Sequence, residues 1–265
     1  MPTEGAAQQH RTSTMFTGEM KAFYDANGYL VVNDVFDAGE LSQIRDQIDA
    51  LLADPETPPE GVTIGREGQT AANRERGEAR DDAIRGAAFL VRFMPFFQEV
   101  ARQANLLSCA RGVLGSGVQV FRDQALFKPP HGQAKPLHQD QSYFRVEPID
   151  GLTTAWIALD DATLDNGCMH YVPGSHLHGI FPVDTDPERP VHHIPRTGEV
   201  ILQQAVACPV ASGSVIFHHG CTLHYSAENR SDTWRRALIF HYASAAARSQ
   251  KESLNREISL PIDPV

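Results

Sequence analysis

The chain has 265 residues, of which 42% are hydrophobic, and its formal net charge is -10. This length and apolar content allow one sizeable core and exclude a disordered or fibrous protein. Because the balance of charge is acidic and no basic stretch interrupts it, a nucleic-acid partner is not expected.

The cysteines predict a protein of a reducing compartment. They lie far apart without a CxxC pair, which fits neither a zinc knuckle nor a disulfide scaffold. Residues 1–20 lack the charged start and apolar stretch of a secretion signal, and no run is long enough to cross a bilayer. We therefore expect a cytoplasmic protein that does not insert into a membrane. The four cysteines are Cys109, Cys168, Cys208 and Cys221.

The part of the chain up to about residue 115 is predicted to be mainly helical. Residues 1–16 are polar and predict a flexible terminus, followed by a single domain over residues 17–265. Thr17 is a suitable N-cap for a helix that Gly28 ends, and residues 29–32 then predict a strand. A second helix is predicted over residues 38–52. A third is predicted from Phe97 to Leu107, with its end near Gly112.

Residues 61–86, between the second and third predicted helices, are rich in Arg, Glu, Gly and Asp. This segment contains few large apolar side chains and therefore predicts a loop or an exposed helix. A solvated charged surface is the favoured interpretation, and a lid over a site is the alternative.

After Gly117, short β-prone runs alternate with turn residues. Many short strands after a helical start indicate a mainly β protein, a sandwich or jelly-roll barrel with the N-terminal helices packed on its outside. The barrel is expected at about residues 118–245, with a C-terminal extension at about 246–265. The predicted strands are residues 118–127, 153–159, 168–172, 200–205, 214–218 and 237–242.

His138-Gln139-Asp140 is the one place where a histidine is followed two residues later by a carboxylate. On an extended segment these two side chains lie on the same face and can bind one ion. Two histidines with one carboxylate leave three coordination positions open, as in non-haem iron oxygenases. The third ligand must come from elsewhere, and His224 stands at the start of a strand-like segment, 11 residues before Arg235. The candidates are His170, His176, His178, His192, His193, His218, His219, His224 and His241.

Several segments together resemble the phytanoyl-CoA dioxygenase family in their order and spacing. The resemblance covers nearly the whole chain and is weakest between about residues 61 and 104. It implies a double-stranded β-helix (cupin-like) fold and iron(II) held by His138, Asp140 and His224. The segments are Gly28-Tyr-Leu-Val-Val32, Lys128-Pro-Pro130, Pro136-Leu-His-Gln-Asp140 with Tyr143-Phe144, Asn166-Gly-Cys168, Pro173-Gly-Ser-His176, and His224-x-Ser226-x-x-Asn229 followed by Arg235.

The resemblance also implies that 2-oxoglutarate chelates the iron and that its far carboxylate meets Arg235 and Ser226. Ser226 shares the strand face of His224, and an arginine fork matches a carboxylate, so the chemistry of these side chains agrees. Trp156 resembles the tryptophan that lines the family's 2-oxoglutarate pocket, and Gln124 matches a position that contacts the co-substrate. Tyr225 departs from the family, which usually has glycine there, so the resemblance does not carry over the shape of the pocket mouth or the acyl-CoA substrate.

Together these residues predict an iron(II)- and 2-oxoglutarate-dependent dioxygenase that uses O2. The expected reaction hydroxylates an unactivated C–H bond of a small molecule and releases succinate and CO2. Desaturation, epoxidation or ring formation at the same centre is the alternative. A zinc hydrolase and a non-catalytic metal-binding β-barrel protein are interpretations from other classes, although a hydrolase would have no use for Arg235 and Ser226. The motifs identify neither the substrate nor the oligomeric state.

Overall fold

The structure is a computed structural model, and it describes residues 16–66, 84–115, 117–185, 192–197, 203–258 and 260–262. The predicted flexible terminus lies outside these ranges, except for Phe16. Residues 67–83, which form most of the segment for which a lid was the alternative, also lie outside them.

The first elements agree with the sequence prediction. Helix α1 (Gly18–Asn27) begins where the Thr17 side chain accepts a hydrogen bond from the backbone of Met20, and it ends at Gly28, whose φ of 78° suits glycine. Strand β1 (Tyr29–Val32) follows directly. Helix α2 (Ala38–Ala53) starts with a capping box between Asp37 and Glu40 and buries one apolar side.

The third predicted helix is wrong in its extent, because two helices occupy that region. Helix α5 (Pro95–Ala101) ends at Arg102, and α6 (Ala104–Leu114) starts after Gln103, whose side chain caps the backbone of Leu106. Gln103 also donates to the backbone carbonyl of Val35, so a contact distant in sequence fixes the break. The short helix α4 (Leu90–Phe93) precedes both.

The larger sheet has the strand order β1-β12-β7-β14-β4-β3-β2, with β16 also paired to β4. Two of these strands correct the prediction of a loop or exposed helix over residues 61–86, because β2 and β3 lie at either end of that segment and join the sheet edge. The bounds are β2 (Thr63–Arg66), β3 (Ile84–Ala88), β4 (Val118–Lys128), β7 (Leu152–Ala158), β12 (Val215–His219), β14 (Arg235–Ser244) and β16 (Leu260–Pro261).

The smaller sheet has the order β11-β8-β13-β5. Its strands are β5 (Lys135–His138), β8 (Met169–Tyr171), β11 (Val206–Cys208) and β13 (His224–Ser226). The prediction of a strand over residues 200–205 is wrong for residues 203–205, the part that the structure describes. The observed strand, β11, starts only at Val206. The remaining elements are β6 (Val146–Glu147), α7 (Asp140–Phe144), η1 (Ser175–His178), β9 (Val183–Thr185), β10 (His193–Pro195), β15 (Arg248–Ser249) and α9 (Glu252–Asn255).

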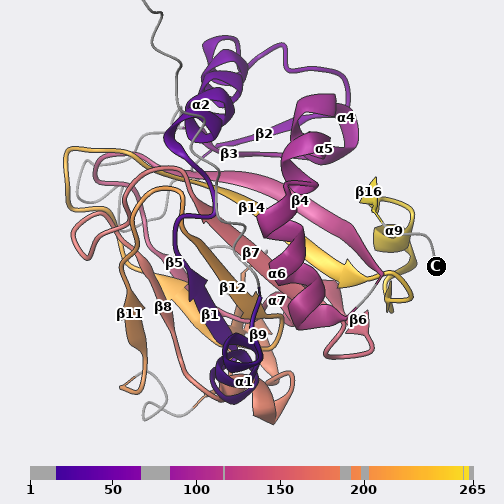
Figure 1. Cartoon of the computed structure of the whole chain (residues 1–265). Helices are drawn as coiled ribbons and strands as arrows, with labels where there is room; N and C mark the ends of the chain where they lie inside the picture. Colours follow the sequence, from indigo (N-terminus) through magenta and orange to yellow (C-terminus); the bar gives the residue numbers. More distant parts are fainter. Residues whose placement is uncertain are drawn as a thin grey trace, which may run out of the picture.

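Two apolar clusters hold these layers together. One lies between the helices and the outer side of the larger sheet, where α6 crosses the sheet face (Figure 1) and side chains such as Ile48, Leu106 and Phe240 are buried. The other lies between the two sheets and contains Trp156, Tyr171 and Ile239. Two antiparallel sheets packed face to face, with helices outside one of them, form the double-stranded β-helix that was predicted.

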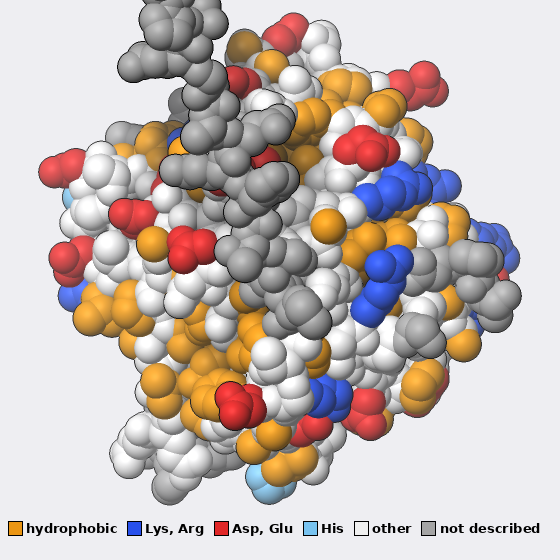
Figure 2. Space-filling model, viewed as in Figure 1, with side chains coloured by type: hydrophobic (Ala, Val, Ile, Leu, Met, Phe, Trp, Pro, Cys, Tyr) orange, Lys and Arg blue, Asp and Glu red, His pale blue; other side chains and the backbone are white. Residues whose placement is uncertain are grey.

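The surface carries mixed charge. On the face shown in Figure 2, Lys and Arg side chains lie among acidic and apolar ones and form no continuous basic surface over the described residues. Among the helices that the structure describes, none combines the length and apolar character needed to cross a bilayer.

Candidate metal centre

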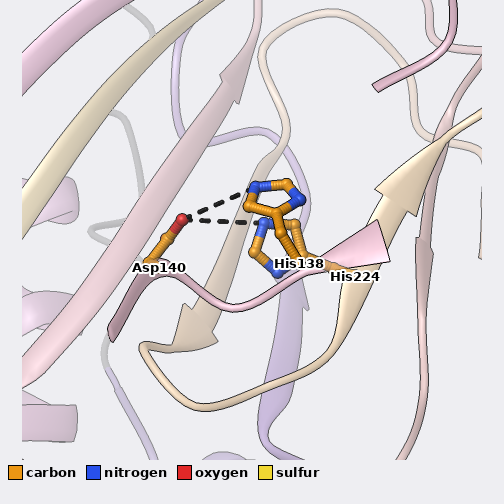
Figure 3. A group of neighbouring side chains, drawn as sticks. All are labelled: His138, Asp140 and His224. Carbon is orange, nitrogen blue, oxygen red and sulfur yellow. Dashed lines mark ion pairs between the residues drawn. The ribbon is translucent and has the colours of Figure 1, made fainter. Parts of the chain in front are cut away.

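Three side chains converge beside strands β5 and β13 of the smaller sheet. His138 ends β5, Asp140 begins α7, and His224 begins β13 opposite His138 in the antiparallel pair. Their ligand atoms all lie within 4.8 Å of one another, and all three residues are buried. One Asp140 oxygen, Oδ1, is 3.8 Å from Nε2 of each histidine, and the side chains point toward one another (Figure 3).

The backbone between His138 and Asp140 explains their shared direction. Gln139 is extended, with φ -125° and ψ 136°, so its neighbours project to one side while its own side chain projects to the other. The Gln139 amide donates to the carbonyls of Gly179 and Cys221. Strand parity therefore holds for this motif, although the structure places Asp140 at the start of a helix.

Backbone carbonyls orient both imidazole rings. His138 Nδ1 lies 2.8 Å from the Pro136 carbonyl, and His224 Nδ1 lies 2.9 Å from the Thr222 carbonyl. A carbonyl only accepts, so each Nδ1 carries the proton and each Nε2 keeps its lone pair toward the cluster. Burial lowers the pKa of His138 well below its usual value and that of His224 to about 4, with neighbouring histidines adding to both shifts. Both rings are thus neutral near pH 7, as metal ligands must be.

Asp140 is held through its second oxygen. Thr154 donates to Oδ2 at 2.6 Å, and His218 Nε2 donates to the same atom at 3.1 Å. Burial by itself would raise the pKa of Asp140, but the hydrogen bond from His218 and the nearby histidines outweigh it and lower that pKa well below its usual value. The carboxylate is therefore ionised, with Oδ1 left to face the two imidazoles.

Two chains of hydrogen-bond donors converge on Asp140 Oδ2. Tyr171 lies 3.1 Å from His218 on the side away from Asp140. On the other branch, His241 Nδ1 lies 2.8 Å from Thr154, and Gln124 reaches His241 Nε2 at 3.5 Å. Because Thr154 donates to Asp140, His241 donates to Thr154 in turn. Gln124 is thereby tied to the metal centre through two intervening side chains.

A cavity of about 560 Å³ opens over the three ligands. Its volume lies within the usual range for sites that bind small molecules. All seven residues proposed from the sequence line it, namely Gln124, His138, Asp140, Trp156, His224, Ser226 and Arg235. Apolar and aromatic side chains also line the cavity, among them those of Leu126, Tyr143, Phe144, Met169 and Ile239.

Arg235 provides a buried positive charge at one end of this cavity. The residue is only 4% exposed, its guanidinium lies 5.3 Å from the centre of the Trp156 ring, and Nε has no hydrogen-bond partner among the described residues. Burial, together with the charge of Arg85, lowers the pKa of Arg235 to about 9. A buried cation with an unused donor is suited to an anionic ligand.

Several residues around the centre escaped the sequence reasoning. Thr154 and His241 support Asp140, and Arg85 adds charge beside Arg235. Alternation along β14 was an available signal for His241, because its position differs from that of Arg235 by an even number and the two side chains therefore share a face of the strand. Arg85 lies in a charged segment without any such pattern.

Other residues have roles outside the cavity. Tyr225 is absent from the lining residues, and its ring stacks on His170 with centres 4.6 Å apart. His219 is bonded to Asp150 and to the backbone of Cys221. Arg122 pairs with Glu257.

The donor set fits iron(II). Two neutral imidazoles and one ionised carboxylate match the ligands this ion accepts, and they approach from one side, which leaves the cavity side free for a co-substrate. Zinc accepts the same atoms, but a zinc site would leave the buried guanidinium of Arg235 unexplained.

Comparisons with known proteins agree with this arrangement. The chain is 24% identical over 268 residues to a probable phytanoyl-CoA dioxygenase of Caenorhabditis elegans, covering 91% of this chain and 80% of that protein. Two solved structures from nogalamycin biosynthesis are each 25% identical. The alpha ketoglutarate dependent carbocyclase SnoK has a TM-score of 0.71 and covers 96% of both chains. The epimerase SnoN, in complex with Fe3+, alpha ketoglutarate and nogalamycin RO, has a TM-score of 0.72, with 93% and 92% covered.

The fold and these likenesses define the class of protein, an iron(II)- and 2-oxoglutarate-dependent oxygenase that consumes O2. Residues 24–237 match the family Phytanoyl-CoA dioxygenase (PhyH), and the chain belongs to this family. It is therefore an oxidoreductase, as the motifs from Lys128 to Arg235 predicted.

Proposed function

We propose that His138, Asp140 and His224 hold the iron(II) and that 2-oxoglutarate lies between this metal and Arg235. The observation that carries the proposal is the convergence of three buried ligand atoms within 4.8 Å at the wall of a cavity that also contains a buried arginine. No other group of three described His, Cys, Asp or Glu residues has its ligand atoms this close.

Arg235, Ser226, Trp156 and Gln124 bind and position the co-substrate in this proposal. The Arg235 guanidinium pairs with the far carboxylate, and the Ser226 hydroxyl donates to it. The Trp156 ring supports the Arg235 guanidinium, which lies over its face in the structure. Gln124 lines the cavity and ends the donor line that runs through His241 and Thr154 to Asp140.

The proposed reaction is hydroxylation of an unactivated C–H bond in a small molecule, with release of succinate and CO2. Bound iron, 2-oxoglutarate and O2 together supply the oxidant for such a bond. The chain's own residues place the substrate and exclude water, for which the apolar side chains of Leu126, Phe144 and Ile239 on the cavity wall are suited. Thr154 and His218 donate to the second oxygen of Asp140, which favours its ionised form.

A second outcome, ring formation or epimerisation on a secondary metabolite, is favoured by one observation. The carbocyclase and the epimerase from nogalamycin biosynthesis cover nearly the whole chain at 25% identity. The same oxidant serves these reactions, so the position of the substrate above the metal decides among them.

We also propose a cytoplasmic location, which the four free, buried thiols support.

The test is an anaerobic screen of the iron(II) and 2-oxoglutarate complex against compound classes, followed through the metal-to-ligand absorption band. Binding of the right substrate shifts the band, and admission of O2 then yields succinate and an oxidised product in equal amounts. A zinc hydrolase would work without 2-oxoglutarate, and a non-catalytic β-barrel protein would release no succinate. Either result would overturn the proposed function.

A further inference from the structure

Lys128, the last residue of β4, is fully buried behind the cavity, with 0% of its surface exposed. Its Nζ donates to Ser226 Oγ at 2.9 Å and also to the carbonyl of Ala227. Across the β4–β14 pair it stands directly opposite Arg235. Lys128 itself is absent from the lining residues, so it reaches the cavity through Ser226.

The chemistry of a hydroxyl group gives this contact a direction. Ser226 Oγ has one proton to donate and two lone pairs to accept with, whereas an ammonium group can only donate. Because Lys128 occupies an acceptor position of Ser226, the hydroxyl proton must point elsewhere. Ser226 lines the cavity, so a carboxylate placed there is an acceptor for that proton.

Gly167 leaves the space that the Lys128 ammonium group occupies. Its φ of +82° is strained for other residues, and a Cβ on it would lie 3.0 Å from Lys128 Nζ and 2.4 Å from the Ala227 carbonyl oxygen. The glycine of the Asn166-Gly-Cys168 segment thus serves the packing of lysine, serine and backbone at this end of the cavity.

We propose that Lys128 is a positioning residue for the co-substrate. It holds the Ser226 hydroxyl so that the proton is directed at the far carboxylate, and it thereby contributes to selection of a 2-oxo dicarboxylate over a 2-oxo monocarboxylate. The inference rests on the proposed placement of 2-oxoglutarate between the metal and Arg235. A purely structural lysine would instead tie β13 to β4 with no effect on ligand choice.

The experiment compares two ligands in anaerobic titrations of the iron(II)-loaded protein, followed through the absorption band. One is 2-oxoglutarate, and the other is 2-oxopentanoate, which carries a methyl group in place of the far carboxylate. The variants are Lys128→Met, Ser226→Ala and the double variant, and thermal unfolding is recorded for each. Lys128→Gln, which keeps an N–H donor, is the conservative variant.

Lys128→Met is expected to weaken 2-oxoglutarate binding about 10- to 100-fold, the loss typical of one hydrogen bond to a charged group. Binding of 2-oxopentanoate should change by less than about threefold. The double variant should bind 2-oxoglutarate within about threefold of Ser226→Ala alone, because Lys128 acts through that hydroxyl. Lys128→Gln should recover part of the loss.

Equal losses for both ligands would show a structural role, and full additivity in the double variant would show that Lys128 acts without Ser226. If Lys128→Met does not fold, Lys128→Gln decides, because a loss confined to 2-oxoglutarate supports the proposal and any other pattern overturns it. Failure of the unsubstituted protein to bind 2-oxoglutarate would refute the proposed function itself. Normal binding there with an unaffected Lys128→Met variant would refute the role of Lys128 alone.

Discussion

Arg235 and Arg236 follow one another in β14 and point to opposite sides of the larger sheet. Arg235 is buried in the cavity over the Trp156 ring. Arg236 is bonded through its backbone and guanidinium to Asp160 and also reaches Asp49. These bonds raise the pKa of Arg236, with Asp160 as the main cause, whereas burial lowers the pKa of Arg235 to about 9.

Arg235→Ala should therefore weaken 2-oxoglutarate binding strongly. Removing one member of a buried charge pair costs about 2 to 5 kcal/mol, which is roughly thirty-fold to a few thousand-fold in affinity. Arg236→Ala is the matched control and should change that affinity by less than about threefold, while lowering the free energy of unfolding by about 1 kcal/mol. Anaerobic 2-oxoglutarate titrations and urea unfolding measure the two effects. A larger binding loss in Arg236→Ala would contradict the assignment.

His224→Ala should abolish iron(II) binding, because only His138 and Asp140 of the proposed ligand set then remain. His170→Ala is the control on the neighbouring strand β8, where the histidine stacks on Tyr225 outside the cavity. Iron content after anaerobic loading and desalting distinguishes the two. Full iron occupancy in His224→Ala would mean that another histidine completes the site.

Thr154→Val removes a donor to Asp140 Oδ2 at nearly constant side-chain volume. Loss of such a supporting contact typically lowers metal affinity about 10- to 100-fold. Thr153→Val is the control on the same strand, because Thr153 bonds Tyr24 and the His218 carbonyl. It should reduce stability without changing iron affinity, as measured by competition with a chelator. Equal affinity losses in both variants would argue against support of Asp140 by Thr154.

The metal-free protein should become less stable as the pH falls from about 6.5 toward 4. The pKa of His224 and that of His241 are each lowered to about 4, by burial first, from an ordinary value of 6.5. In this window the unfolded chain takes up protons that the folded chain does not, so the free energy of unfolding decreases as the pH falls. The total loss is on the order of a few kcal/mol. Urea unfolding at a series of pH values measures it.

Asp140 acts in the same sense as the histidines, but over a separate window at lower pH. Its pKa is lowered in the folded state, so its contribution to stability is lost only at a pH below its ordinary value of 3.8. His241→Gln should flatten part of the decline between pH 6.5 and 4. A free energy of unfolding that stays constant over this range would show that the buried histidines do not titrate as expected.

The convergence of most of the proposed site residues was predictable because their geometry is local. An extended Gln139 puts His138 and Asp140 on one side, and strand alternation puts Ser226 on the face of His224. The pairing of His224 with His138 is distant in sequence, and only the resemblance to the family selected it among nine histidines. Parity also separated Arg235 from Arg236.

The remaining features depend on contacts that no local pattern encodes. Strand β3 arises from its pairing with β4, and at Gly86 a Cβ would lie 2.4 Å from the Ala125 carbonyl oxygen, so the close approach selects glycine. The break between α5 and α6 follows from the bond of Gln103 to Val35. Lys128, Thr154 and His218 support the centre through neighbours that come together only in the folded barrel.

The pairing of β13 with β5 also governs when the chain can hold its metal. His138 and Asp140 are neighbours in the sequence and are synthesised almost at the same time. His224 reaches them only after the long loop between β5 and β13 has been closed and the two strands have paired in register. A newly made or partly unfolded chain offers at most two of the three ligands. If these three residues are the ligands, as proposed, we expect iron loading only in the finished barrel and loss of the ion from a chain that loses this register.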